Sequence, residues 1–246
     1  MYQPRHYRLW VHSPELISFA VSLGETDLLI QASKDLRRQA KRLVRKHRVA
    51  LEGYIGAHPD FLTSLAPLEV DDCAPQIVRT MSAAAATAGV GPMASVAGAI
   101  AEAVGLGLLK FSKEVIIENG GDIFIRSASR RIVAIYAGDS PLSGKLGLEI
   151  CAENPLGVCT SSGTVGHSLS FGEADAVVVL SPSAALADAA ATAVANRVSR
   201  PEDIDPALEF GRTISGVTGL FIIKGASFGA WGDVKLCRTE TEEKPG

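Results

Sequence analysis

The alternation of apolar and polar residues predicts strands at the start of the chain. In "FAVSLGETDLLIQAS" two β-prone runs surround "GETD", so residues 5–31 read as strands with a hairpin turn at Gly24. From Ser33 the apolar spacing becomes helical. One helical face then holds Leu36, Ala40, Leu43, Val44, His47 and Leu51. This pattern predicts a helix that Ser33 caps, with Asp35 in its first turn.

Two helices rich in small residues are predicted next. They cover residues 75–88 and 93–108, and "GVGPM" separates them with two glycines and a proline. Because alanine and glycine let backbones approach closely, we expect these helices to pack tightly against a sheet.

The second half of the chain predicts more strands around one helix. Residues 113–150 read as a meander with connections at "ENGGD" and "SASRR". The strand "ADAVVVL" leads into an alanine-rich helix, with Ser181 as N-cap and Pro182 at its first position. Residues 216–237 add two or three strands. Paired helices between strands that read as antiparallel favour an α+β fold over a doubly wound parallel sheet.

Length and composition indicate one large domain. The chain has 246 residues, of which 47% are hydrophobic, and this is ample for a sizeable core. No composition break marks a linker, so we expect a single domain over residues 1–246. The order of the elements also suggests two intertwined halves, about 1–110 and 111–246.

Charge and cysteine usage argue against several classes of protein. The net charge of −3 gives no global field toward nucleic acid or an anionic membrane. The first residues lack the pattern of a secretory signal, and no apolar run reaches about 18 residues. The four cysteines are scattered, which favours reduced thiols. We therefore expect a cytoplasmic protein that does not bind membranes.

The segment from Lys34 to Arg48 contains eight Lys and Arg residues and is the most charged part of the chain. A solvated helix face explains it most simply. Attraction of an acidic partner or RNA remains the alternative.

Three short stretches are candidates for chemistry. Asp188 and Thr192 are four residues apart on one helix, which suits a half-site for Mg²⁺. An exposed aspartate beside a threonine bonded to its own helix is the alternative. In "ENGGDIF", backbone amides and Asp122 could contact a ligand, or the glycines only form a hairpin turn.

The third stretch, "CTSSGTVGHS", does not have the spacing of a nucleophile elbow. Cys159 follows "GV", where a strand would bury it, and His167 is eight residues away. Hydroxyls and glycine amides around a ligand carbonyl or phosphate are the better interpretation.

In this order, four stretches resemble the ApbE-like superfamily, which includes FAD:protein FMN transferases. They are "GPMASVAGAIAEAVG", "NGGDIFI", "VCTSSGTVGHS" and "ADAAATAV", within roughly residues 80–200, and the last is the most specific. The resemblance implies an α+β duplication related to the T-fold, with antiparallel sheets backed by paired helices. It looks closest to a cytosolic branch, distinct from the transferases proper.

The resemblance also implies a site, position by position. Asp188 and Thr192 match the residues that hold the divalent metal, for which Mg²⁺ is expected. His167 stands where the transferases carry a histidine, and would be a general acid or base. The flavin nucleotide site is matched by Asn119, Gly120, Gly121, Asp122, Thr160, Ser161, Ser162 and Gly163.

The chain departs from the transferases in its short segment after Gly163, which lacks their Asp-Pro element. Two functions therefore stay open. One is a Mg²⁺-dependent enzyme that uses FAD or a related nucleotide. The other is a binding module for a flavin or other heterocyclic ligand without turnover. Tight packing of the alanine-rich helices also makes a homo-oligomer an expectation.

Overall fold

The strands of this protein form one antiparallel sheet. The computed structural model describes residues 15–163 and 172–239. Its nine-stranded sheet follows the chain order from β1 to β8, and β9 pairs with the beginning of β5. The strands are β1 (Ile17–Leu23), β2 (Thr26–Ala32), β3 (Val115–Asn119), β4 (Asp122–Ala134), β5 (Leu146–Ser161), β6 (Ala176–Ser181), β7 (Gly219–Lys224), β8 (Ser227–Gly232) and β9 (Leu236–Arg238).

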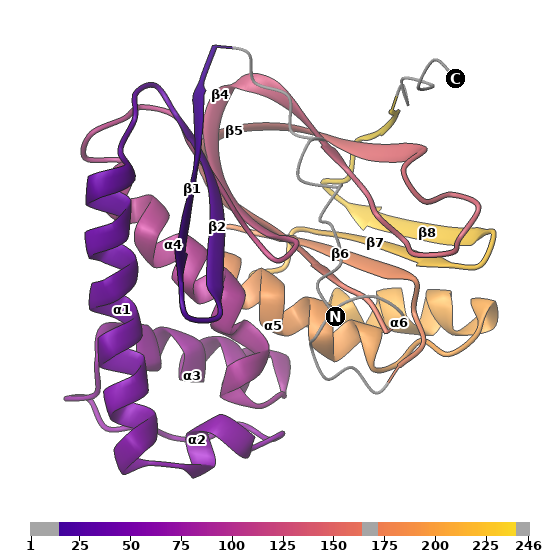
Figure 1. Ribbon diagram of the computed structural model, residues 1–246. Helices are drawn as coiled ribbons and strands as arrows, with labels where there is room; N and C mark the ends of the chain where they lie inside the picture. The colour runs from indigo at the N-terminus through magenta and orange to yellow at the C-terminus, as the bar shows by residue number, and fades with distance from the viewer. Residues whose placement is uncertain (1–14, 164–171, 240–246) are drawn as a thin grey trace.

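The helices gather on one side of the sheet (Figure 1). Between β2 and β3 lie α1 (Arg37–Ala57), α2 (Asp60–Thr63), α3 (Gln76–Ala88), the 3-10 helix η2 (Pro92–Ser95) and α4 (Val96–Leu108). Between β6 and β7 lie α5 (Ala184–Ala195), the 3-10 helix η3 (Pro201–Asp203) and α6 (Ile204–Gly211). The order strand, strand, helices, strand, strand therefore occurs twice. The predicted α+β fold, with antiparallel strands backed by paired helices, is confirmed.

The sheet is buried on both faces in its centre. One hydrophobic core lies between the sheet and the helices and includes Ile30, Ile117 and Val179. A second core covers the opposite face and includes Ile125 and Leu148. Figure 1 shows β4 and β5 curving over this second face. Every residue of the central strands β3 and β6 is therefore buried, and most of these residues are apolar.

Small residues bring α5 into close contact with both α4 and β5. A Cβ atom added to Gly98 of α4 or to Gly157 of β5 would overlap the backbone of Ala184. The buried residues of α5 are alanines and one valine. The predicted tight packing of small-residue helices thus occurs at the point where two helices and the sheet meet.

One predicted connection is wrong, because "SASRR" lies inside β4 and is not a turn. The strand shifts register there, between Ile125 and Arg131. Arg131 is buried, donates to Ser127 Oγ at 2.9 Å and forms an ion pair with Glu114 at 2.6 Å. Polar residues here form an internal cluster instead of a solvated turn.

Two predicted helix caps are also corrected. Ser33 Oγ contacts Ser112 Oγ at 2.9 Å, so it does not cap α1, and Asp35 instead accepts a hydrogen bond from the Arg37 N–H. Helix α5 begins two residues later than predicted, because Ser183 Oγ accepts from the Leu186 N–H. Ser181 remains in β6.

Across residues 15–163 and 172–239, no single helix is both long and apolar enough to cross a membrane. Taken together, Gln76–Ala88 and Pro92–Leu108 meet such a criterion by length and composition, but they are bent by 102°.

Gly157→Ala tests the contact between α5 and the sheet. The added methyl group meets rigid backbone, so we expect the substitution to destabilise the protein by about 1–3 kcal/mol. Gly53→Ala in α1 is the matched control, since nothing lies near its Cβ position, and it should stabilise by about 0.5–1 kcal/mol. Urea unfolding measures both, and equal effects would contradict the packing described above.

Candidate functional site

Four elements bring predicted site residues together beneath the end of the β3–β4 hairpin. Asn119 and Asp122 flank the hairpin turn and pair with each other across it. The side chain of Asp122 meets β5 at Cys159 and Thr160. The N-terminal turn of α4 and Asp188 of α5 close the cluster from the helix layer. These segments lie far apart in the sequence and meet at one place in the fold.

The hairpin turn requires both of its glycines. Gly120 and Gly121 have φ of 69° and 108°, a region that favours glycine. The Gly121 N–H donates to Glu118 Oε1 at 2.9 Å. That amide therefore has a partner within the protein, and a role of the turn in binding a ligand stays a prediction.

Asn119 ties the hairpin to α4. Its side chain is 8% exposed, and its Nδ2 donates to the carbonyl of Ala97 at 3.0 Å. This hydrogen bond joins the end of β3 to a carbonyl in the first turn of α4. Asn119 thus fixes the position of α4 relative to the turn.

Asp122 is a buried carboxyl with incomplete hydrogen bonding. It is 7% exposed, and its Oδ1 has no hydrogen-bond partner among the described residues. Burial raises the pKa of Asp122 to about 7, and the charge of Glu118 adds to this. Hydrogen bonds from Cys159 and from the Thr160 N–H act in the opposite direction.

Asp188 is the second carboxyl of the cluster. Its Oδ2 accepts from the Gly98 N–H at 2.8 Å, close to the start of α4. This half-buried residue has a raised pKa because of burial and, next, because of the charge of Asp122. Two acids near each other in a poorly solvated site disfavour the doubly ionised state.

Asp188 and Thr192 supply oxygen ligands for a hard cation, but these two residues do not form a complete coordination shell. Thr192 follows Asp188 by one helical turn and is half-buried. Within the described part of the chain, no group of three or more His, Cys, Asp or Glu is placed to hold a metal ion. The predicted pair Asp188 and Thr192 is therefore a partial ligand set, and its role as a metal site stays a prediction.

The hydroxyl-rich stretch forms the end of β5 and the turn after it. Ser161 is buried, and Thr160 and Ser162 are half-buried. The Gly163 N–H donates to the Ala174 carbonyl at 2.9 Å. Within this stretch, the backbone N–H of Thr160 donates a hydrogen bond to the Asp122 carboxyl group. Its role in binding a nucleotide stays a prediction.

Cys159 is fully buried, with its Sγ 3.3 Å from the Ala184 carbonyl and its thiol also facing Asp122. Burial, followed by the charges of Asp122 and Asp188, raises the pKa of this thiol. A protonated buried thiol is a poor nucleophile, in agreement with the inert residue expected from the sequence. His167 lies outside the described residues, so its catalytic role stays a prediction.

Sequence reasoning missed Glu102 of α4. Its Oε2 accepts from Ser183 Oγ at 2.9 Å and from the Ala185 N–H at 3.1 Å. A carboxylate at a helix N-terminus complements the helix dipole. Because Glu102 occupies the start of α5, an anionic ligand has no free access to that helix end. The sequence did contain a sign of this role, because Glu102 is the single charged residue in the small-residue helix predicted at 93–108.

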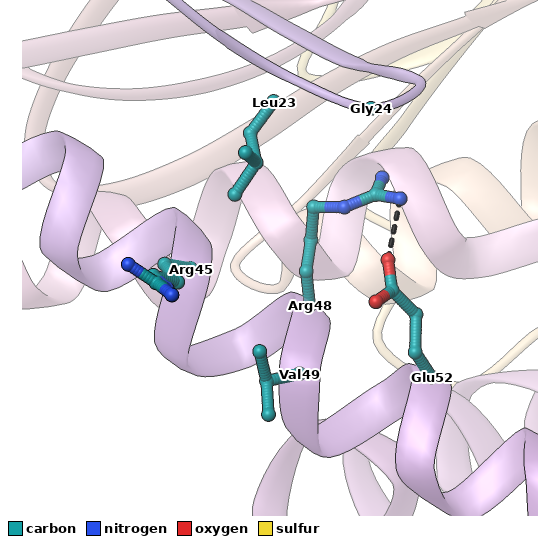
Figure 2. A pocket seen from close by; sticks show the side chains of 6 residues that line it. All are labelled: Leu23, Gly24, Arg45, Arg48, Val49 and Glu52. Atoms are coloured by element: carbon teal, nitrogen blue, oxygen red, sulfur yellow. Dashed lines mark hydrogen bonds and ion pairs between the residues drawn. The ribbon is translucent and has the colours of Figure 1, made fainter.

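A pocket of about 530 Å³ lies elsewhere, between the β1–β2 hairpin and α1 (Figure 2). It is lined by Leu23, Gly24, Arg45, Arg48, Val49 and Glu52. None of these residues belongs to the cluster around Asp122. The chemistry of the cluster, and not the size of this hollow, therefore identifies the candidate site.

The raised pKa of Asp122 predicts that the stability of the protein depends on pH. The folded protein keeps a proton on Asp122 up to about pH 7, whereas the unfolded chain loses it near 3.8, so stability falls as pH rises between these values. Asp122→Asn should remove the contribution of Asp122 to this dependence, while that of Asp188 remains, and should be more stable above pH 7 by a few kcal/mol, on the order of 1.4 per pKa unit. Urea unfolding between pH 5 and 8, with a chelator, measures it. Asp139→Asn at an exposed turn is the control, and parallel profiles for wild type and Asp122→Asn would contradict the prediction.

Comparisons with known proteins identify the family. The model described as "AbpE bacteria" matches residues 8–225. A UPF0280 protein of Methanocaldococcus jannaschii is 45% identical over 229 residues, which cover 89% of this chain and 93% of that protein. A UPF0280 protein of Methanococcus vannielii is 44% identical over 240 residues, with 94% and 97% covered.

Among solved structures, the apo form of the flavinyl transferase ApbE of Pseudomonas stutzeri matches with a TM-score of 0.53. The match covers 91% of this chain and 95% of that chain at 15% sequence identity, which shows a shared fold. The resemblance to the ApbE-like superfamily is thereby confirmed. This chain belongs to the AbpE bacteria family and is a relative of the UPF0280 proteins.

Proposed function

We propose that this protein binds a flavin nucleotide such as FAD, or another heterocyclic nucleotide, at the cluster around Asp122 and Asp188, with Mg²⁺ as cofactor. Three facts support the proposal. The fold is shared with a flavinyl transferase. The predicted ligand-binding stretches converge. The cluster also contains a polar atom, Oδ1 of Asp122, for which the described residues provide no hydrogen-bond partner.

That atom, Oδ1 of Asp122, carries most of the argument. A buried acceptor without a partner costs about 1–3 kcal/mol, so its persistence calls for an explanation. An N–H group of a heterocyclic ligand, or a cation, would satisfy it. The neighbouring Asn119 amide does not satisfy this atom and donates to the Ala97 carbonyl instead.

The residues fit a divalent cation. Carboxylate and hydroxyl oxygens are the donors that Mg²⁺ prefers, and Asp188 and Thr192 would hold it. The mutual repulsion of Asp122 and Asp188 is relieved when a cation lies near them. When bound, Mg²⁺ neutralises the diphosphate of a nucleotide. Asp188 would then exchange its contact with the Gly98 N–H for the metal.

The corresponding reaction class is transfer of FMN from FAD to an acceptor hydroxyl, which breaks the diphosphate bond and releases AMP. His167 would accept the hydroxyl proton as general base. A second candidate is ligand binding without turnover. It is favoured by the short sequence between Gly163 and the next strand, which lacks the Asp-Pro element that the resemblance to the transferases leads us to expect.

Titration of FAD fluorescence tests the site. We expect saturable quenching with Mg²⁺, and Asp188→Asn should weaken FAD binding at least about tenfold, because one cation ligand and one contact to α4 are lost. Asp205→Asn on the exposed side of α6 is the control and should bind like wild type. No quenching in wild type, or equal binding by both variants, would rule out the proposed site.

Mass spectrometry separates the two candidates. Incubation with FAD and Mg²⁺ should release AMP if the protein is an enzyme, and His167→Ala should slow this release by about 10²–10⁴-fold while FAD binding persists. Bound FAD with no AMP and no modified acceptor supports the binding module instead. Release that His167→Ala leaves unchanged removes the general-base role from this residue.

A further inference from the structure

The outer edge of the sheet presents an open strand. Among the described residues β1 pairs only with β2. Leu23 and Thr26 pair across a two-residue turn, and in such hairpins the pair beside the turn is hydrogen-bonded. Bonding alternates from there along the strand. The backbone N–H and C=O groups of Ser18, Ala20 and Ser22 therefore point outward.

Within the described part of the chain, β1 lacks the features that commonly protect an edge strand from pairing. Its sequence, "ISFAVSL", contains no charge and no proline. Charged residues, proline or β-bulges commonly prevent the edge strands of natural proteins from pairing with another strand. Ile17 is 48% and Leu23 is 41% exposed, and they lie on the same side of the strand as the buried Phe19 and Val21. An added strand would find both backbone partners and apolar contacts here.

A cationic helix flank lies beside the edge. Helix α1 packs on β1, with the Arg37 guanidinium 5.9 Å from the centre of the Phe19 ring. On the opposite flank of α1, Leu43 contacts α4 at Gly107. Helical spacing places Lys41 and then Arg45 one and two turns after Arg37, on the flank over the open edge. Lys41 and Arg45 form no ion pair with another described residue.

The pocket of Figure 2 lies at the end of this row. Leu23 and Val49 form its apolar part. Arg48 is occupied, since it contacts Glu25 at 2.5 Å and Glu52 at 2.6 Å. Arg45 also lines the pocket and is free to meet an incoming carboxylate.

We propose that the β1 edge binds an acidic, extended peptide of a partner protein as an added strand. Backbone hydrogen bonds to Ser18, Ala20 and Ser22 supply the pairing. Because side chains alternate along a strand, acidic residues at every second position face Lys41 and Arg45. A second copy of this chain fits poorly, because pairing of two β1 strands brings two cationic α1 flanks together.

The test uses the full chain and a fluorescein-labelled peptide of alternating threonine and glutamate, measured by fluorescence anisotropy. We expect saturable binding that weakens with salt. Lys41→Glu should weaken it about tenfold, as loss and reversal of exposed ion pairs permit. Lys46→Glu, exposed on the other flank of α1, is the matched control and should leave the affinity unchanged.

Two N-methylated peptides test strand pairing without altering the protein. One peptide is methylated on the amides that would point toward β1, and the other is methylated on the amides that would point away from it. Only the first peptide loses its backbone hydrogen bonds to β1. We expect one peptide to bind and the other to fail. Equal binding of both, equal weakening by Lys46→Glu, or no binding at low salt would overturn the proposal. Displacement of the peptide by oligouridylate, with the same loss in both variants, would do so as well, because it indicates a general polyanion surface.

Discussion

The contact of α4 and β5 with the backbone of Ala184 is the constraint on which the rest of the structure depends. Gly98 and Gly157 approach this residue from two sides, and neither position has room for a Cβ atom. Larger side chains would move α5 outward by the width of a methyl group or more. Asp188 would then lose both the Gly98 N–H and its proximity to Asp122. Close packing therefore creates the electrostatics of the candidate site.

The cluster places carboxyl groups in a part of the protein that is otherwise stabilised by the burial of apolar side chains. Apolar burial stabilises the fold, yet the same burial raises the pKa of Asp122 and of Asp188. Burying two carboxyl groups close together is costly, and one oxygen of Asp122 has no hydrogen-bond partner among the described residues. Perturbed acids of this kind gather at functional sites more often than elsewhere. The cluster is therefore better explained by the binding of a ligand or cation than by any contribution to stability.

Much of this architecture could be predicted from the sequence, for physical reasons that differ between elements. The small-residue helices and the hairpin turn at Gly120 and Gly121 follow from local preferences, and the structure has both. The strand through "SASRR" was missed, because the buried pairing of Arg131 with Glu114 is non-local. The helix cap at Glu102 was missed for the same reason. Motif order identified the residues around Asp122, but only the fold shows how they meet.

One contact has an evolutionary consequence. A Cβ atom on Gly163 would overlap the carbonyl of Gly172, so the chain leaves β5 and returns at nearly the same point. For a loop whose ends already touch, closure entropy rises by only about 0.6 kcal/mol for each doubling of length. The segment between these glycines can thus grow or shrink by insertion and deletion while the sheet is preserved. Changing the length of this segment therefore costs little folding free energy. Relatives with this fold can differ in activity through this segment while the sheet stays the same.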